Sequence, residues 1–296
     1  MTGSAVLQVK GSLRRKISFC HDISAPEFIL SIIQDGYRLP LETISSGNVL
    51  NNNMSSLHYP KFVEETYNFR TLAFVSGGRS PSSPYVVNPL SVSVQPNGKK
   101  RLILDLRYVN KHLIKQRVKY EDWKIALSYF QKGAFMISFD LKSGYHHIDI
   151  SPDHQTFLGF AWKFSGDTKF RYFVFTVLPF GLASAPFIFT KCLKPLEKYW
   201  RIHGISVALF LDDGWLIDSD QVSCAALTVC VRSDLWKAGV ITNDEKSHWT
   251  PCQVIEWLGI VWDSSNSTIR ISDRRLSSIA DCVERMSQKR FKVSAR

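Results

Sequence analysis

Apolar runs alternate with short turn-forming stretches over most of the chain, a pattern typical of strands and helices that share a core. Residues 90–94 and 101–106 are two such runs, and the Pro-Asn-Gly stretch 96–98 between them predicts a β-hairpin. Residues 134–140 form a third run, which predicts a buried strand ending on Asp140. An acidic residue is thus expected at the end of a strand inside the protein.

A second hairpin is predicted from residues 205–211 and 215–218, with Asp212-Asp213-Gly214 at its turn. Residues 254–262 and 268–272 predict two more strands around a turn at 264–267. Helical spacing of apolar residues predicts four helices: 27–36, 193–200 up to Gly204, 222–237 closed by Gly239, and an amphipathic segment after Ser272.

Two polar stretches predict loops: residues 45–56, rich in Ser and Asn, and residues 76–84, rich in Gly and Pro. Between the loops, strands interleave with helices, which predicts an α+β fold with a sheet packed on helices. The split β-α-β, ferredoxin-like arrangement is the expected form of this sheet.

Charge favours a polyanionic partner. The 296 residues include 37 Lys and Arg against 26 Asp and Glu, a formal net charge of +11. Such an excess suits nucleic acid, because binding to phosphates releases counterions, although it also suits a membrane surface. The uncharged stretch 172–190 is long enough to span a bilayer, but Pro179, Gly181 and Pro186 divide it into a strand, a turn and a helix start. No membrane span is therefore expected.

The six cysteines form no C-x-x-C pair, so neither a zinc site nor a dense disulfide framework is indicated. Free thiols are typical of a reducing compartment. No charged-then-apolar signal peptide opens the sequence. We expect an intracellular location, in the cytoplasm or the nucleus.

Asp140 and Asp212 are the candidate chemical groups, because both follow apolar strands that could deliver carboxylates to one end of a sheet. Nucleotidyl transfer depends on two hard cations that neutralise charge on the attacking and leaving oxygens, and carboxylates are suitable ligands. Taken alone, an Asp in a turn more often caps local backbone. The pattern of acids by itself is only suggestive.

Longer motifs carry a family resemblance. Residues 139–148 (Phe-Asp-Leu-Lys-Ser-Gly-Tyr-His-His-Ile), 178–186 (Leu-Pro-Phe-Gly-Leu-Ala-Ser-Ala-Pro) and 210–213 (Phe-Leu-Asp-Asp) resemble, in this order, the motifs of retroelement reverse transcriptases. Residues 257–259 (Trp-Leu-Gly) resemble the primer-grip hairpin that follows, and the similarity covers about residues 85 to 262. Residues 36–41 and 211–214 look most like DIRS-type retrotransposons.

The resemblance implies a right-hand polymerase with a ferredoxin-like palm and a fingers β-hairpin. The expected division is an N-terminal, partly flexible extension (1–60), fingers and palm (61–262), and the truncated start of a thumb or connection (263–296). A longer polyprotein with a linked RNase H domain is implied. No RNase H activity is expected in this chain, since no second acid cluster follows Leu258.

The resemblance also implies catalytic roles. Asp140 and Asp212 would bind two Mg²⁺ ions, for which Mn²⁺ can substitute, and Asp213 would have a weaker or indirect part in the metal site. Lys246 matches the lysine that protonates the leaving pyrophosphate. The implied partners are an RNA or DNA template–primer and deoxynucleoside triphosphates, with no membrane.

The resemblance also implies substrate contacts from residues that precede Asp140 in the sequence or lie between Asp140 and Asp212. Arg101 would grip the triphosphate, Ser143 and Gly144 would offer it backbone N–H groups, and Tyr145 would lie under the sugar; Phe180 and Gly181 would shape the template and nucleotide pocket. One position departs from the family pattern: residues 94–96 (Val-Gln-Pro) stand where many relatives have a lysine. Lys99 or Lys100 would have to replace it from the other side of the hairpin.

Three other functions fit parts of the pattern. A catalytically inactive nucleic-acid-binding remnant would not need the acids at 140, 212 and 213. An RNA-directed RNA polymerase shares paired acids, but Tyr145 and the Phe-Gly pair at 180–181 favour DNA synthesis. A nucleotide cyclase has a similar sheet, yet no matching signature loop is present. His146 and His147, adjacent on one segment, are expected to be structural or solvated rather than metal ligands.

Overall fold

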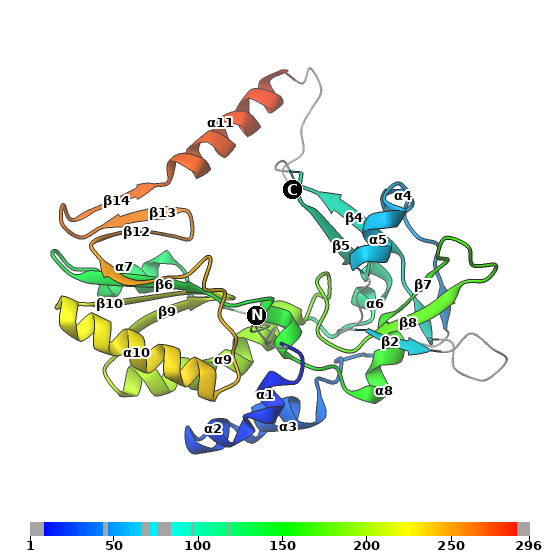
Figure 1. Ribbon diagram of the computed structural model, residues 1–296, viewed down its shortest axis with the longest axis horizontal. Coiled ribbons are helices and arrows are strands. Elements are labelled where there is room, and N and C mark those ends of the chain that lie inside the picture. The colour runs from blue at the N-terminus through cyan, green and yellow to red at the C-terminus, as the bar shows by residue number, and fades with distance from the viewer. Residues whose placement is uncertain are drawn as a thin grey trace, which may run out of the picture. The chain divides into compact units, whose positions relative to one another are not determined.

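The computed structural model describes residues 9–43, 47–66, 72–75, 84–95, 98–117 and 119–288. The chain divides into two compact units, each built from several segments (Figure 1). Unit 1 comprises Met1–Lys119, Lys142–Leu196 and Leu235–Ile241, and unit 2 comprises Tyr120–Leu141, Glu197–Asp234 and Thr242–Arg296. The predicted boundaries at residues 60 and 262 stay predictions.

Unit 2 contains a four-stranded antiparallel sheet in the order β11-β6-β10-β9. Along the chain the elements run β6, α9, β9, β10, α10, β11, which is the split β-α-β arrangement predicted from the sequence, although residues 185–196 of α9 and 235–237 of α10 are assigned to unit 1. Their bounds are β6 Phe135–Asp140, α9 Ala185–Ile202, β9 Ser206–Phe210, β10 Asp213–Asp218, α10 Gln221–Lys237 and β11 His248–Cys252.

A smaller antiparallel sheet, β12 (Val254–Trp257), β13 (Ile260–Asp263) and β14 (Thr268–Ile271), belongs to the same unit. The apolar run 254–262 forms two strands and not one, because Leu258 and Gly259 both have positive φ (54° and 69°) and form a hairpin turn, at the residues 257–259 for which the resemblance implied a hairpin. Figure 1 shows α10 on one face of the four-stranded sheet and β12–β14 on the other.

Tryptophans fill the core between these two sheets. Trp215 of β10 is fully buried, and its ring lies 5.4 Å from that of Trp262 and 6.1 Å from that of Trp257. Met136 of β6 belongs to the same apolar cluster. Trp257 therefore packs in the core of unit 2. The unit also contains α7 (Trp123–Tyr129) and the amphipathic α11 (Asp273–Gln288), which has no buried residue.

Unit 1 holds a five-stranded sheet in the order β1-β3-β7-β8-β2 and the separate hairpin β4–β5. The strands are β1 Asn48–Val49, β2 Leu72–Val75, β3 Val86–Val87, β4 Leu90–Val94, β5 Lys100–Leu104, β7 Gly159–Trp162 and β8 Arg171–Phe175. The helices are α1 Ser12–Arg15, α2 Ile17–Asp22, α3 Glu27–Asp35, α4 Met54–Leu57, α5 Pro60–Thr66, α6 Arg107–Lys111, α8 Pro152–Gln155, and the short 3₁₀ segments η1 Gly144–His147 and η2 Thr156–Leu158.

The two loops predicted in unit 1 can be compared with the structure only in part. The stretch 45–56 contains β1 and the start of α4, so its prediction as a loop was wrong where it is described. Most of the predicted loop 76–84, and Pro96 and Asn97 of the hairpin turn, lie outside the described residues. In the uncharged stretch 172–190, β8 ends at Phe175 and α9 begins at Ala185. Among the described residues no helix has the length and apolarity to cross a bilayer.

Candidate active site

The turn between β9 and β10 carries two of the predicted acids. Asp213 pairs in register with Phe210 of β9 and with Asp140 of β6, so Leu211 and Asp212 form a two-residue turn. Leu211 has φ 54°, in the left-handed region that is unfavourable for a residue with a Cβ atom. The prediction that Asp213 and Gly214 belong to the turn was wrong. Both lie in β10, because pairing with two neighbouring strands extends the ladder to the turn.

Gly214 leaves room for the ring of Phe139, its partner on the neighbouring strand β6, beside these acids. A Cβ atom at this position would lie 2.1 Å from the ring of Phe139. That ring stacks on Trp249, with ring centroids 5.4 Å apart and planes inclined by 6°. A residue larger than glycine would therefore displace the side chain that precedes Asp140.

Asp140 is held at the end of β6 by the segment that follows α10. Its backbone N–H donates to Ser247 Oγ (3.1 Å), and its carbonyl accepts the N–H of Asn243 (2.8 Å). Asn243 Nδ2 also donates to Asp140 Oδ1 (3.0 Å), and Lys246 Nζ lies 3.4 Å from Oδ2. The Asp140 side chain is 15% exposed and that of Lys246 is 63% exposed. The carboxylate is thus oriented on one side and solvent-accessible on the other.

A backbone hydrogen bond links the β9–β10 turn to the end of β6. Leu141 N–H donates to the carbonyl of Asp212 (2.8 Å), which brings the turn beside the residue that follows Asp140. The structure therefore brings together four predicted residues within unit 2: Asp140, Asp212, Asp213 and Lys246.

The pKa of Asp213 reflects its burial and the charges of this cluster. Burial, and then the negative charges of Asp212 and Asp140, raise the pKa of Asp213 to about 6, while Lys246 opposes the shift. Three carboxylates near one ammonium leave an excess of negative charge, and a cation would relieve their repulsion. Carboxylate oxygens are suitable ligands for Mg²⁺, which also keeps several waters.

No group of three His, Cys, Asp or Glu side chains in the described part of the chain is arranged to hold a metal ion by itself. A site here would need water or phosphate oxygens beside the carboxylates, as magnesium sites commonly do. The donor set fits such an ion without forming a closed cage.

The other six predicted residues belong to unit 1. Ser143 is exposed and has φ 56° and ψ 37°, and Gly144 is buried as the first residue of η1. The Tyr145 ring lies 5.1 Å from that of Phe180 and 5.4 Å from that of Phe189. Phe180 is 51% exposed, so one face of this aromatic group is open. The structure brings together Tyr145, predicted to lie under the sugar, and Phe180, predicted to shape the template and nucleotide pocket.

Gly181 needs its lack of a side chain. Its φ is 99°, and a Cβ atom would lie 2.8 Å from the carbonyl oxygen of Leu104. Asn110 holds the same loop: its Nδ2 donates to the Gly181 carbonyl, and its Oδ1 accepts the N–H of Ala183, both at 2.9 Å. Sequence reasoning missed Asn110, since nothing in its local pattern marks a contact with a loop about seventy residues later.

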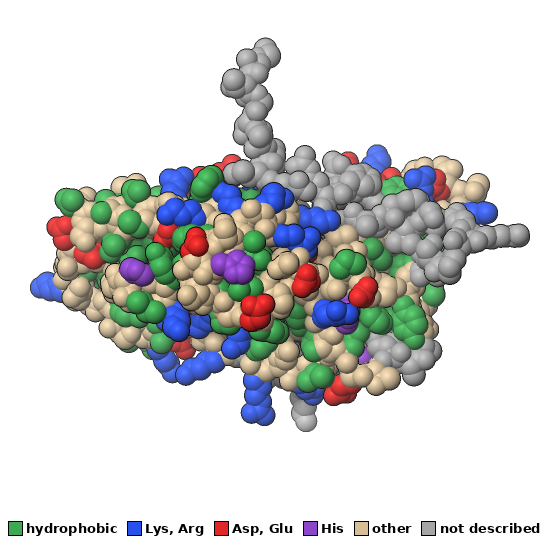
Figure 2. Space-filling view, turned by 90° about the horizontal axis from the view of Figure 1, so that it is seen from below, with side chains coloured by type: hydrophobic (Ala, Val, Ile, Leu, Met, Phe, Trp, Pro, Cys, Tyr) green, Lys and Arg blue, Asp and Glu red, His purple; other side chains and the backbone are tan. Residues whose placement is uncertain are grey.

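Arg101 lies on β5 opposite Ser93 and is exposed. Lys100, one of the two residues considered as a replacement for the missing lysine, lies opposite Val94, with Nζ 5.2 Å from the ring centre of Tyr59. Figure 2 shows Lys and Arg side chains distributed over the face seen from below, with Asp and Glu between them. The positive charge on that face is spread out and does not form one compact patch.

A family model described as reverse transcriptase (RNA-dependent DNA polymerase) matches residues 93–262, more than half of the chain. The chain belongs to this family. The matched segment contains all ten predicted site residues, from Arg101 on β5 to Lys246 before β11. The predicted family is thereby confirmed, whereas the DIRS-type assignment stays a prediction.

Relatives of this reverse transcriptase chain include transposon and viral polyproteins. The Pol polyprotein of transposon opus from Drosophila melanogaster is 26% identical over 220 residues, which are 72% of this chain and 21% of that protein. That of transposon gypsy is 27% identical over 185 residues, 62% of this chain and 17% of that protein. The Pro-Pol polyprotein of feline foamy virus is 28% identical over 167 residues, 56% of this chain and 13% of that protein. The chain thus spans a minor part of each relative.

Solved structures support the fold. The foamy viral protease–reverse transcriptase in complex with double-stranded DNA matches with a TM-score of 0.63 at 17% identity, over 100% of this chain and 52% of that chain. The same viral protein in complex with an RNA/DNA hybrid matches with a TM-score of 0.62 at 17% identity, over 95% and 38% of the two chains. At this identity the similarity shows a shared reverse transcriptase fold.

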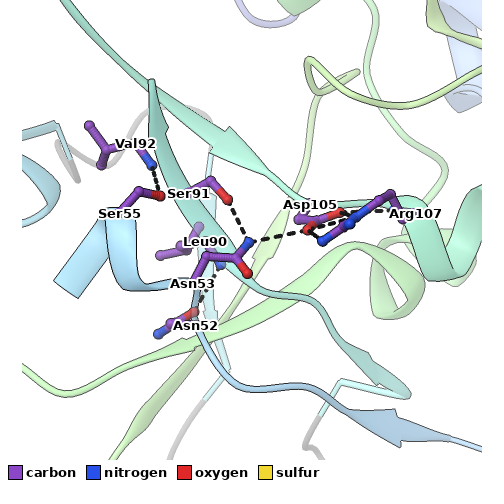
Figure 3. Close-up of polar contacts among 8 residues, drawn as sticks. All are labelled: Asn52, Asn53, Ser55, Leu90, Ser91, Val92, Asp105 and Arg107. Atoms are coloured by element: carbon purple, nitrogen blue, oxygen red, sulfur yellow. Dashed lines mark hydrogen bonds and ion pairs between the residues drawn. The ribbon is translucent and has the colours of Figure 1, made fainter. Parts of the chain in front are cut away.

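A polar network at the base of the β4–β5 hairpin was not predicted from the sequence (Figure 3). Arg107 Nε and Nη2 donate to the two carboxylate oxygens of Asp105, at 2.9 Å and 2.6 Å. These hydrogen bonds are the main reason that the pKa of Asp105 lies below its ordinary value, against the opposing effect of burial. The Arg107 side chain is 82% exposed and that of Asp105 is 12% exposed. The pair therefore presents an oriented guanidinium to solvent.

Residues just before and at the start of α4 complete this network from outside the family match. Asn53 Nδ2 donates to Asp105 Oδ2 (3.1 Å) and to Ser91 Oγ (2.6 Å). Asn52 Oδ1 accepts the N–H of Leu90 (2.9 Å), and Ser55 Oγ accepts that of Val92 (3.2 Å). These side chains satisfy backbone donors along the open edge of β4, which would otherwise be free to pair with another strand.

Proposed function

We propose that this chain is the polymerase core of a retrotransposon reverse transcriptase, which extends a primer with deoxynucleotides on an RNA or DNA template. The observation that supports it best is the cluster at one end of the ferredoxin-like sheet. There Asp140, the Asp212–Asp213 turn and Lys246 lie together within unit 2. Acids so arranged, in a chain of this family, suit nucleotidyl transfer better than they suit a turn-capping role.

Asp140 and Asp212 would hold two Mg²⁺ ions, which Mn²⁺ can replace, with Asp213 in a weaker or indirect role. When bound, the ions would neutralise charge on the attacking and leaving oxygens. Asn243 keeps Oδ1 of Asp140 in one orientation through its 3.0 Å hydrogen bond, so the carboxylate does not have to be ordered during the reaction. Lys246 Nζ, 3.4 Å from Asp140, would hold the proton that the leaving pyrophosphate accepts.

Within unit 1, Ser143 and Gly144 would offer backbone N–H groups to the triphosphate, and Arg101 would donate to its phosphate oxygens. Tyr145 and Phe180, whose rings are 5.1 Å apart, would contact the sugar and the base. Gly181 would keep the adjoining loop close to β5, as its tight approach to Leu104 requires. Exposed basic groups such as Arg107 would contact nucleic-acid phosphates.

The partners would be a template–primer and deoxynucleoside triphosphates. The net charge of +11 supports a nucleic-acid partner, because each phosphate contact releases counterions. The foamy viral relative of the same fold has been solved with double-stranded DNA and with an RNA/DNA hybrid. We further propose that the chain functions intracellularly as part of a longer polyprotein with an RNase H domain.

Primer extension by the purified chain with Mg²⁺ tests the proposal, on matched RNA and DNA templates with deoxynucleotides or ribonucleotides. We expect extension on RNA and a strong preference for deoxynucleotides. The Tyr145 ring should exclude a 2′-hydroxyl, since close-packed atoms cannot retreat. Tyr145→Val should keep extending while losing most of that preference, measured as the ratio of kcat/KM for the two sugars. No extension would support an inactive remnant, and a preference for ribonucleotides would support an RNA polymerase.

A further inference from the structure

The last residue of η1 is a histidine that the proposed chemistry does not use. The His147 side chain belongs to the buried interior of unit 1, with 3% of the residue exposed. Its Nδ1 lies 2.9 Å from the carbonyl oxygen of Gly144, and its Nε2 lies 2.9 Å from the backbone nitrogen of Ile241. Both ring nitrogens are therefore engaged by backbone groups.

These contacts fix the protonation state of the ring. The Ile241 N–H donates, so Nε2 must carry a lone pair and the single ring proton must sit on Nδ1. The Nδ1–H then donates to the Gly144 carbonyl. Burial lowers the pKa of His147 to about 4, so the ring stays neutral at neutral pH. A neutral imidazole is the form that satisfies both backbone partners.

The bond to Gly144 sets the direction of a peptide group in the proposed triphosphate turn. Because a trans peptide is planar, a carbonyl of Gly144 aimed at His147 fixes the plane of the Gly144–Tyr145 peptide, and with it the conformation of Gly144, whose own N–H is proposed to contact the triphosphate. The turn needs such support, since Ser143 is held at φ 56° despite its Cβ atom. Ile241 backs the turn a second time, because its carbonyl accepts the N–H of Lys142 at 2.8 Å.

We propose that His147 is a positioning residue for nucleotide binding: its Nδ1–H holds the Ser143–Gly144–Tyr145 turn in the orientation that presents backbone N–H groups to a triphosphate. The inference rests on the proposed polymerase function and deepens it. His147 does not touch the nucleotide. It acts through the Gly144 carbonyl, and the bond to Ile241 anchors the ring itself.

Two substitutions separate the two bonds. An Asn amide reaches the position of Nδ1, so His147→Asn can still donate to Gly144 but loses Ile241. A Gln amide reaches the position of Nε2, so His147→Gln can still accept from Ile241 but leaves the Gly144 carbonyl without its donor. Each variant loses one bond from the same buried site, so similar losses of thermal stability are expected from both.

Single-turnover primer extension measures the apparent nucleotide Kd and the maximal rate of each variant. We expect His147→Gln to raise Kd about three- to tenfold, the effect of one lost hydrogen bond, with a maximal rate within about twofold of wild type. His147→Asn should keep a Kd close to wild type. The melting temperature of each protein is recorded beside these values, because a purely structural histidine would lower it without separating the two Kd values.

Equal Kd values in both variants, with an active wild type, would overturn the positioning role and leave the polymerase proposal standing. A raised Kd in His147→Asn alone would also overturn it, since Ile241 would then be the contact that matters. A wild-type chain that fails to extend any primer would overturn the proposed function, and this inference with it.

Discussion

In unit 2, Asp140 and Asp213 lie opposite each other in neighbouring strands, whereas in unit 1 Ser143 and Gly144 lie in a turn supported by one imidazole. Strand pairing fixes the positions of the acids: β10 pairs with β6 over six residues and with β9 over five. The turn depends on side-chain contacts from His147 and on backbone contacts from Ile241.

The difference follows from what each group must do. Burial first, and then the negative charges of Asp212 and Asp140, raise the pKa of Asp213, and a rigid sheet can hold these carboxylates together despite that cost. Backbone N–H groups need only the correct peptide orientation, which a few side-chain hydrogen bonds can set. Substitutions in unit 2 should therefore alter chemistry or disrupt the sheet, while those in unit 1 should have smaller, graded effects.

The largest effect is expected from removing one carboxylate while keeping the ladder intact. Asp212→Asn should lower primer extension on the order of a thousandfold, because an ion-binding charge worth several kcal/mol is lost. Template–primer affinity, measured by fluorescence anisotropy, should stay nearly unchanged, since the basic surface remains. Asp281→Asn on the exposed α11 is the matched control. Near-normal extension by Asp212→Asn would show that the acids of this turn are not catalytic.

The second-largest effect is expected from a substitution that disturbs the pairing of β6 and β10 but leaves every acid in place. Gly214→Ala should destabilise the protein by about 1–3 kcal/mol, because the new Cβ would lie 2.1 Å from the Phe139 ring. Gly204→Ala separates this clash from backbone strain: Gly204 has φ +80° with open space around it, and its substitution should cost about 1 kcal/mol. Urea unfolding measures both. A smaller loss for Gly214→Ala than for Gly204→Ala would mean that the sheet adapts easily at this position.

A third substitution measures what it costs to keep Asp213 charged, through burial first and then through the neighbouring acids. The folded-state pKa of Asp213, about 6, lies above its ordinary value of 3.8, so its contribution to stability is lost as pH rises through this interval. Partial exposure screens the effect, which leaves about 1–2 kcal/mol at pH 7. Asp213→Asn should therefore stabilise the metal-free protein at pH 7 and have little effect near pH 4.

Urea unfolding in the presence of a chelator, at both pH values, checks this result. Wild type and variant are compared at the same pH, so the titration of other groups cancels. A gain of equal size at pH 4 and pH 7 would assign the stabilisation to something other than the cost of ionising Asp213. Adding Mg²⁺ should then stabilise wild type more than the variant, because the ion relieves a repulsion that the variant lacks.

The smallest effect is expected at the network under the β4–β5 hairpin. Asn53→Ala removes one donor to Asp105, which keeps its hydrogen bonds from Arg107, so a stability loss of about 1 kcal/mol is expected. Template–primer affinity should fall about twofold as Arg107 becomes less ordered. Asn52→Ala is the control, because Asn52 contacts Leu90 and Ala161 but not Asp105. Identical affinities in both variants would remove Asn53 from any role in orienting Arg107.

Local sequence pattern predicted most elements of unit 2. Apolar runs located β6, β9 and β10, helical spacing located α9 and α10, and their order along the chain predicted the ferredoxin-like sheet. The errors lie at turns. Gly214 looked like a turn residue because glycine favours turns, yet it lies in a strand, where its missing Cβ makes room for Phe139. Local propensity cannot distinguish these two uses of glycine.

The candidate site was predicted unevenly. Motifs supplied Asp140, Asp212 and Lys246, and the structure finds these residues near one another. The residues that orient them were missed: Asn243 lies 103 positions from Asp140, and Asn110 lies 71 positions from Gly181. Nothing in a short window of sequence distinguishes such an asparagine from one that faces solvent.

The sequence by itself determined which residues carry charge, which runs are apolar and in what order strands and helices follow one another, because these are properties of neighbouring residues. Only the tertiary structure decided that Asp213 faces Asp140, that Leu211 takes a left-handed conformation, and that His147 donates to Gly144 and accepts from Ile241. The physical reason is that strand register and buried hydrogen bonds are chosen by the packing of segments up to about a hundred residues apart.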